Sequence, residues 1–173
     1  MATLRGRLLL AGPGLVDPNF FRTVILMLEH GDDGAIGVIL NRPTDLPVRD
    51  ALPPWADTVS DPAVVFVGGP VAPGTAIALG RSLDVEPVVG AFGMLDLEQS
   101  PTACHDVRLF SGYAGWGPGQ LEDEIDEDSW IILEARPDDV ASDDADELWS
   151  IVLARQPGPL ALLARYPDEP AFN

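Results

Sequence analysis

The apolar residues fall mostly in short dense runs, and these runs predict a succession of β-strands. Residues 23–29 are densely apolar, as expected for a strand buried on both faces, and residues 6–11 predict a first strand before it. A turn with two glycines at residues 30–34 leads into a return strand at 35–40, so these two strands should pair. Further strands are predicted at residues 64–67, 75–79, 88–95, 107–113 and 130–134.

A helical period marks the last third of the chain. Its apolar residues recur at i, i+3, i+4, i+7 and i+8, which predicts an amphipathic helix whose apolar face lies in the core. These residues are Ala145, Leu148, Trp149, Val152 and Leu153. Strands first and helices last predict an α+β fold, with a mixed, mostly antiparallel sheet flanked by helices.

The remaining segments are shorter or irregular. Ser142 is a residue type that caps helices, and residues 46–52 predict one or two helical turns. Residues 98–106 predict a loop or a short helix, and the proline-rich residues 156–173 predict an irregular tail. Because no linker or internal repeat is visible, we expect residues 1–173 to form a single domain.

Charge narrows the classes of partner. The net charge is −18, from 28 acidic residues against 10 basic ones, all of which are arginine. An acidic surface repels phosphate, so we expect neither direct nucleic-acid binding nor binding to anionic membranes. The acid-rich residues 122–147 suit a basic protein partner, although such a segment is also typical of a solvated surface.

The single cysteine, Cys104, excludes an intrachain disulfide and a cysteine-rich zinc site, and it fits a reducing compartment. The uncharged residues 62–80 are broken by prolines and glycines, so they do not predict a membrane span. We therefore expect a soluble cytoplasmic protein without a cofactor or a metal site. The sequence does not fix the oligomeric state.

Residues 110–124 carry the most specific pattern of the chain. A strand end leads into a glycine-rich turn, and an acidic helix is predicted to begin at Pro118. The four glycines are Gly112, Gly115, Gly117 and Gly119. Such a unit is either a structural turn or an anion-binding site at a helix start, with Trp116 and Gln120 as the groups available to a ligand. The carboxylates in the first helical turn disfavour phosphate, and the spacing matches no nucleotide-binding loop.

Several motifs then agree on a family. They lie at residues 6–13, 17–24, 28–30, 34–43, 67–71 and 112–124, in GRLLLAGP, DPNFFRTV, LEH, GAIGVILNRP, VGGPV and GYAGWGPGQLEDE. On these motifs the chain closely resembles the YqgE/AlgH family of bacterial proteins, also called UPF0301. The resemblance implies a single α+β domain and a mostly uncharacterised cytoplasmic protein. One branch of that family is described as regulators of transcription, and the resemblance implies no catalytic residue.

The polar residues of these motifs are the candidates for a site. If the strands at 23–29 and 35–40 pair, one end of the pair holds a polar cluster and the turn end holds another. The ligand-binding candidates are Asp17, Arg22, Asn41, Arg42, Gly115, Trp116, Gly117 and Gln120. The secondary candidates are Glu29, His30, Glu122 and Glu124. Each also has a structural interpretation, as an ion pair, a strand-ending turn or a hydrogen-bonded turn histidine.

Three classes of function remain open. The first is a regulatory or interaction protein that acts through a protein partner. The second is a small-ligand or nucleotide-binding module that uses Arg22, Arg42 and the glycine-rich turn 112–120. The third is a metal-assisted enzyme, which a carboxyl group of raised pKa in a cleft would support.

Overall fold

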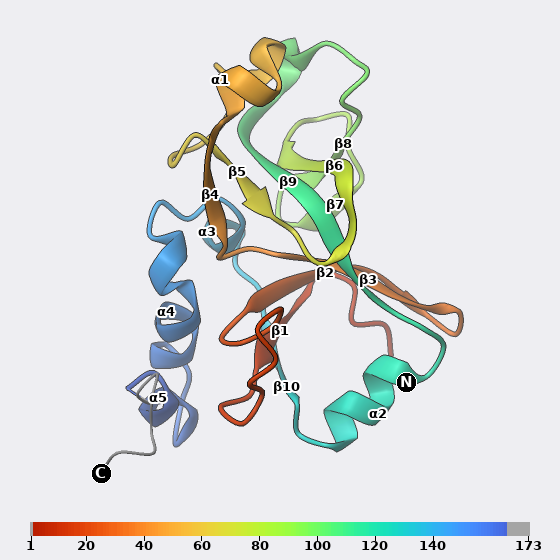
Figure 1. The fold of residues 1–173 in the computed structure, drawn as a ribbon, viewed down its shortest axis with the longest axis vertical. Helices are drawn as coiled ribbons and strands as arrows, with labels where there is room; N and C mark the ends of the chain where they lie inside the picture. Colours follow the sequence, from red (N-terminus) through yellow and green to blue (C-terminus); the bar gives the residue numbers. More distant parts are fainter. Residues whose placement is uncertain (1, 166–173) are drawn as a thin grey trace.

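The sheet is organised around β9 (His105–Trp116), which runs through the middle of the molecule (Figure 1). The structure is a computed structural model and describes residues 2–165. The first half of β9 pairs antiparallel with β6 (Val71–Arg81), and its last residues pair antiparallel with β3 (Gly34–Ile39). β5 (Val64–Val67) lies parallel to its middle. This shared strand joins ten strands into one curved sheet, and the predicted mixed, mostly antiparallel α+β fold is confirmed.

In one half of the sheet the strand order is β10, β1, β2, β3. β10 (Trp130–Glu134), β1 (Arg7–Ala11) and β2 (Val24–Gly31) each run antiparallel to their neighbours. The hairpin of β2 and β3 turns at residues 31–34, which confirms the pairing predicted for these two strands. In this half the dense apolar runs of the sequence are the strands themselves.

A helix covers each face of this half (Figure 1). α4 (Leu148–Ala154) packs on one face in a cluster with Leu8, whereas α2 (Gln120–Asp126) packs on the other with Leu9. Because alternate residues of a strand point to opposite faces, one apolar run fills both clusters. The amphipathic stripe predicted at 145–153 is confirmed, since its apolar residues are buried in this core.

The other half continues from β6 through β8 (Phe92–Leu95) to β7 (Pro87–Val89). β4 (Pro43–Pro47) pairs with β5 and leads into the short helix α1 (Val48–Ala51) and a 3₁₀ turn, Pro53–Trp55. A third, smaller hydrophobic cluster lies beneath this turn. No helix in residues 2–165 is long and apolar enough to cross a membrane.

Three glycines allow two distant segments to cross in close contact. A Cβ atom at Gly68 would meet the carbonyl oxygen of Gly112, and a Cβ atom at Gly69 would meet the backbone of Tyr113 and Ala114. A Cβ atom at Gly112 would lie 2.5 Å from the carbonyl oxygen of Gly69, and Gly112 has φ +74°. Only glycine fits where backbone meets backbone at this distance. We call this contact of residues 68–70 with 112–114 the glycine crossing.

The structure corrects several predicted strands. The strand predicted at 88–95 is two strands, β7 and β8, because Gly90 at φ +56° turns the chain between them. β9 continues to Trp116, so Gly112 and Gly115 lie within a strand and not in a turn. β4 was not predicted, since its two prolines concealed a short edge strand.

The predicted helices also need correction. α2 begins at Gln120 and not at Pro118, because Gly119 takes the left-handed conformation before it, at φ +75°. Ser142 does not cap the amphipathic helix; its Oγ accepts the Asp144 N–H at 3.2 Å, and a 3₁₀ turn (Ala145–Glu147) comes before α4.

Two short helices were not predicted at all. α3 (Pro137–Val140) lies before the amphipathic helix, and α5 (Leu160–Leu163) lies inside the predicted irregular tail. The last part of that tail, residues 166–173, is outside the described residues. Of residues 98–106, the first part is a loop with one 3₁₀ turn (Pro101–Ala103), and the last two residues already belong to β9.

Candidate functional site

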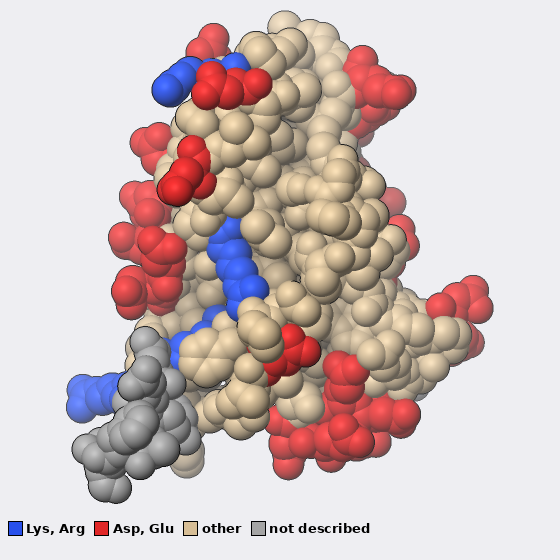
Figure 2. Space-filling view, viewed as in Figure 1, with Lys and Arg blue, Asp and Glu red and all other residues tan. Residues whose placement is uncertain are grey.

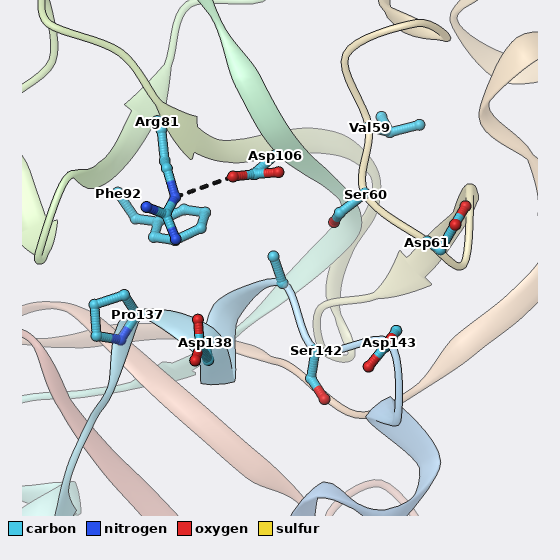
Figure 3. Close-up of a pocket in the computed structure, with 11 residues that line it drawn as sticks. Val59, Ser60, Asp61, Arg81, Phe92, Asp106, Pro137, Asp138, Ser142 and Asp143 are labelled. Atoms are coloured by element: carbon cyan, nitrogen blue, oxygen red, sulfur yellow. Dashed lines mark ion pairs between the residues drawn. The ribbon is translucent and has the colours of Figure 1, made fainter.

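A cavity of about 550 Å³ lies between the β6–β9 half of the sheet and the segment that contains α3 (Figure 3). We call it the charged cavity. Its charged and hydroxyl lining comes from Ser60, Asp61, Arg81, Asp106, Asp138, Ser142 and Asp143. These residues belong to segments far apart in the sequence, and Arg108 of β9 helps to join them through hydrogen bonds to the carbonyl oxygens of Asp61 and Ser142. A cavity of this size is in the range of small-molecule sites, although its lining is more polar than is usual for them.

Arg81 projects from the end of β6 into this cavity (Figure 3). Its guanidinium lies on the ring of Phe92, at 4.7 Å from the ring centre. Its Nε is 3.1 Å from Oδ2 of Asp106, within ion-pair distance, yet this buried N–H has no aligned acceptor within residues 2–165. The contact is therefore a charge pair without a well-directed hydrogen bond. Asp106 reaches it from a left-handed conformation, φ +53°, which is uncommon for a residue with a side chain.

Arg108 lies behind the cavity and is 2% exposed. Its guanidinium donates to the carbonyl oxygens of Ser142 at 3.0 Å and Asp61 at 2.8 Å, and to Oγ of Ser60 at 3.0 Å. Burial lowers the pKa of Arg108 to about 10, against the attraction of Asp143 and Asp61, so the group stays charged at neutral pH. One buried cation thereby fastens two of the segments that form the cavity wall.

The charged cavity has a net negative charge. Four aspartates line it, against Arg81 in the wall and Arg108 behind the wall, which leaves a charge of about −2. Figure 2 shows that acidic side chains gather along one edge of the molecule and at the corner occupied by α2. The field of the surface therefore favours cations as ligands.

A polar cluster was predicted at the end of the β2–β3 pair away from the turn. Arg22, Asn41 and Arg42 do lie together there, but their hydrogen bonds hold a loop in place. Asn41 accepts the Val24 N–H and donates to the Arg22 carbonyl, both at 2.9 Å. Arg42 donates to the carbonyls of Asn19 at 2.9 Å and Phe21 at 3.1 Å. Burial lowers the pKa of Arg42, while Asp17 opposes this shift.

Arg22 of the same cluster lies over an aromatic ring. Its guanidinium carbon is 4.4 Å from the ring centre of Trp149, which attaches the loop to α4. Gln120 is at the other end of the β2–β3 hairpin, after Trp116, which pairs with Ala35. Arg22 and Arg42 therefore do not gather with Gln120 around one pocket, an arrangement that would have favoured the small-ligand or nucleotide-binding module.

The predicted turn residues converge on one carboxylate. Oε1 of Glu124 accepts the indole N–H groups of Trp116 at 3.0 Å and Trp130 at 2.9 Å, and Oε2 accepts the amide of Gln120 at 2.9 Å. Oε1 of Gln120 accepts the Gly117 N–H at 3.0 Å. These contacts fasten α2 to the end of β9, so Gln120 and Glu124 hold the turn in place.

A hydrogen bond between His30 and Glu122 is a second contact that holds α2 in place. The Leu4 N–H donates to Nδ1 of His30 at 3.0 Å, so Nδ1 is unprotonated and Nε2 carries the proton that it shares with Glu122 at 2.6 Å. This hydrogen bond is the main cause that holds the pKa of Glu122 below its usual value of 4.5. With both ring nitrogens engaged, His30 ties the N-terminal segment to α2 and is not placed as a free base.

A second hollow, of about 400 Å³, gathers three more of the predicted residues. Gly115, Trp116 and Glu29 line it together with Val71, Tyr113 and Asp33. We call it the aromatic cavity. It lies at the end of β9, whereas the charged cavity is at the start of the strand.

The residues of the charged cavity were not predicted from the sequence. Asp61, Asp138 and Asp143 fall in loops or at a short helix, and no local pattern marks them. One signal was present: Arg108 interrupts the apolar pattern between Val107 and Leu109. A charged residue at a buried strand position must have partners, and those partners lead to the cavity.

Two expectations of a metal-assisted enzyme find no support in the described part of the chain. No group of three or more histidine, cysteine or acidic residues within residues 2–165 is placed to hold a metal ion. The carboxyl pKa that departs clearly from its usual value is that of Glu122, and the shift is downward, not upward.

The chain is similar over its whole length to curated bacterial proteins. A UPF0301 protein of Streptomyces avermitilis is 48% identical over 187 residues, which cover 100% of this chain and 97% of that protein. A UPF0301 protein of Mycobacteroides abscessus is 42% identical, with 97% of this chain and 87% of that protein covered.

Two solved structures share the fold. A crystal structure of a protein from Corynebacterium diphtheriae has a TM-score of 0.88 at 30% identity, and covers 95% of this chain and 93% of its own. The solution structure of the AlgH protein from Pseudomonas aeruginosa has a TM-score of 0.71 at 27% identity, with 98% of both chains covered. The sequence profile described as AlgH-like matches residues 8–161. The chain therefore belongs to the AlgH-like family, whose curated members are named UPF0301 proteins.

Proposed function

We propose that this protein binds a small, polar, positively charged molecule in the charged cavity. The observation that carries the proposal is the cavity itself, where Arg81 and four aspartates meet around about 550 Å³. A compound with several amino groups, such as a polyamine or an amino sugar, has the chemistry that matches this lining. Its ammonium groups would pair with the aspartates, and a hydroxyl or carboxylate oxygen would accept a hydrogen bond from the guanidinium of Arg81.

The rigidity of the wall supports the same proposal. Arg108 fixes Ser60, Asp61 and Ser142 through buried hydrogen bonds, so the walls need little reordering when a ligand enters. On the far side, Asp139 accepts two hydrogen bonds from Arg155 at 2.7 Å, which ties α3 to the residue after α4. The site is preorganised on both sides.

The test is a thermal-shift titration of the purified protein with spermidine at moderate salt. A ligand at a hundred times its Kd adds about 2.7 kcal/mol to the free energy of unfolding. The variant Asp138→Asn should weaken this stabilisation, whereas the matched variant Asp123→Asn, on α2 and away from the cavity, should leave it unchanged. Equal loss in both variants would show non-specific attraction to the acidic surface and would refute the proposal.

A protein partner is the second candidate, because the molecule exposes an apolar surface. Residues 71–76 of β6 are all exposed, and Leu46 nearby is 47% exposed. Leu46 borders an apolar hollow of about 210 Å³ between α1 and β6. This surface supports the regulatory or interaction function predicted from the sequence. The test is capture of a cellular protein by the wild type but not by Leu46→Asp, with Leu162→Asp, at a leucine that is 72% exposed, as the control for an exposed apolar residue elsewhere.

A further inference from the structure

The aromatic cavity combines apolar walls with a glycine that leaves room. Tyr113 and Trp116 supply rings, and Val71, which is 38% exposed, supplies an aliphatic wall. At Gly115 a Cβ atom would sit 3.5 Å from the Tyr113 ring and 3.7 Å from the Val71 side chain, which is ordinary contact. Packing therefore does not require glycine here, and any side chain at 115 would project into the cavity.

Two carboxylates stand at the rim of this apolar space. Glu29 and Asp33 line the cavity and are exposed, and neither forms an ion pair or a side-chain hydrogen bond with another residue of the described chain. No arginine or histidine lines the cavity. The hydroxyl of Tyr113 also has no hydrogen-bond partner within residues 2–165.

We propose that the aromatic cavity binds a small organic ammonium compound with an alkyl or aromatic body. The body packs on Tyr113 and Val71, and the ammonium group pairs with Glu29 and Asp33. Aromatic rings attract a cation to their faces, which adds to the pull of the two carboxylates. An anion of the same shape is repelled, and a neutral analogue lacks the charge that the carboxylates require.

The occupant is a free small molecule and not a protein side chain. The cavity, of about 400 Å³, is in the size range of small-molecule sites. It is also separate from the charged cavity: Asp106 is at the start of β9 and Trp116 at its end, roughly 30 Å apart at the usual rise per strand residue. The two sites are therefore testable independently.

The experiment is isothermal titration of the full chain with three compounds of similar shape. They are 2-phenylethylamine, 2-phenylethanol and 3-phenylpropanoate. We expect saturable binding of the amine, binding of the alcohol weaker by about tenfold or more, and no binding of the acid, since a charge-assisted hydrogen bond is worth about that factor. Equal binding of amine and alcohol, or no saturable binding of the amine, would overturn the proposal.

Matched variants locate the site. Gly115→Val fills the cavity and should abolish amine binding, whereas Gly117→Val, which also meets no crowding, should bind as the wild type does. Asp33→Asn should weaken binding by about tenfold, while Asp32→Asn, which lines a different hollow beside His30, should not. Unchanged binding in both Gly115→Val and Asp33→Asn would overturn the assignment. Binding of a blocked lysine peptide in place of the free amine would do so too, in favour of a protein partner.

Discussion

The glycine-rich segment of residues 112–119 is held by different contacts at its two ends. At the glycine crossing, Gly69 and Gly112 bring backbone against backbone, with no room for a Cβ atom. At the end of β9, Gly115 and Gly117 meet no crowding, and the chain is fastened by the side chains of Glu124 and Gln120. Glycines a few residues apart thus have different roles. Gly112 allows two backbone segments to touch, whereas Gly115 leaves an unfilled space beside the strand.

This difference shows that glycine density alone does not identify a turn or a phosphate-binding loop. The pattern from Gly112 to Gly119 covers a strand, a turn and a helix start. What each glycine does depends on the segment that lies opposite, and that segment is more than forty positions away in the sequence at Gly112.

Gly69→Ala should destabilise the protein most. The added Cβ atom meets the backbone of Tyr113 and Ala114, which cannot move aside as a flexible side chain can. We expect a loss of about 3 kcal/mol or more in the free energy of unfolding, measured by urea denaturation. Gly74→Ala, with nothing within 4 Å of its Cβ position, is the control and should change little. Similar losses in both variants would show that the crossing is not tight.

Glu124→Gln, at the end of the segment with Gly115 and Gly117, should lower the free energy of unfolding by about 1–2 kcal/mol. The carboxylate accepts hydrogen bonds from two indoles and from the Gln120 amide. A glutamine at position 124 would place its own NH₂ group against one of these N–H donors. Tryptophan fluorescence should shift together with the unfolding midpoint, because Trp116 and Trp130 lose a charged acceptor. Glu127→Gln, at the end of α2, is the control. An unchanged midpoint would mean that α2 is held by its apolar face alone.

The effect of Glu122→Gln on stability should depend on pH. The folded-state pKa of Glu122 lies below its unfolded value, so its contribution is complete above about pH 4.5 and is lost as pH falls through the folded-state pKa. The variant should therefore lose stability at neutral pH and differ less from the wild type in acid. Parallel profiles of melting temperature against pH would contradict the His30–Glu122 contact.

Gly115→Ala should have the smallest effect on stability, within about 0.5 kcal/mol of the wild type. Its Cβ atom finds only ordinary contacts, and alanine restricts the unfolded chain more than glycine does. Differential scanning calorimetry on this variant and on Gly117→Ala would measure it. A loss as large as that of Gly69→Ala would remove the distinction between the two ends of the motif.

The sequence predicted those parts of the fold that depend on local pattern. The β2–β3 hairpin and the apolar stripe of α4 follow from patterns within one short stretch of sequence, and both are confirmed. The length of β9 could not be predicted, because Gly112 in its interior is explained only by residues 68–70 on a distant segment. β4 was missed because prolines at both its ends disfavour a strand in isolation.

The candidate site was predicted less well than the fold. The motif residues Asn41, Arg42 and Gln120 do come into contact with their neighbours, but those contacts hold a loop and a helix. The four aspartates of the charged cavity come from three separate segments of the chain, and no spacing rule joins them. Tertiary contacts bring their segments together, among them the hydrogen bonds of Arg108 to Ser142 and Asp61.

The sharing of β9 between both halves of the sheet also sets the order in which the molecule opens. Amide protons near its middle, at Phe110 and Ser111, lie between β5 on one side and β6 on the other. Local fraying at either edge of the sheet does not expose them, so they should exchange with solvent only when the whole sheet unfolds. The same strand that separates the two cavities is then the slowest-exchanging part of the protein.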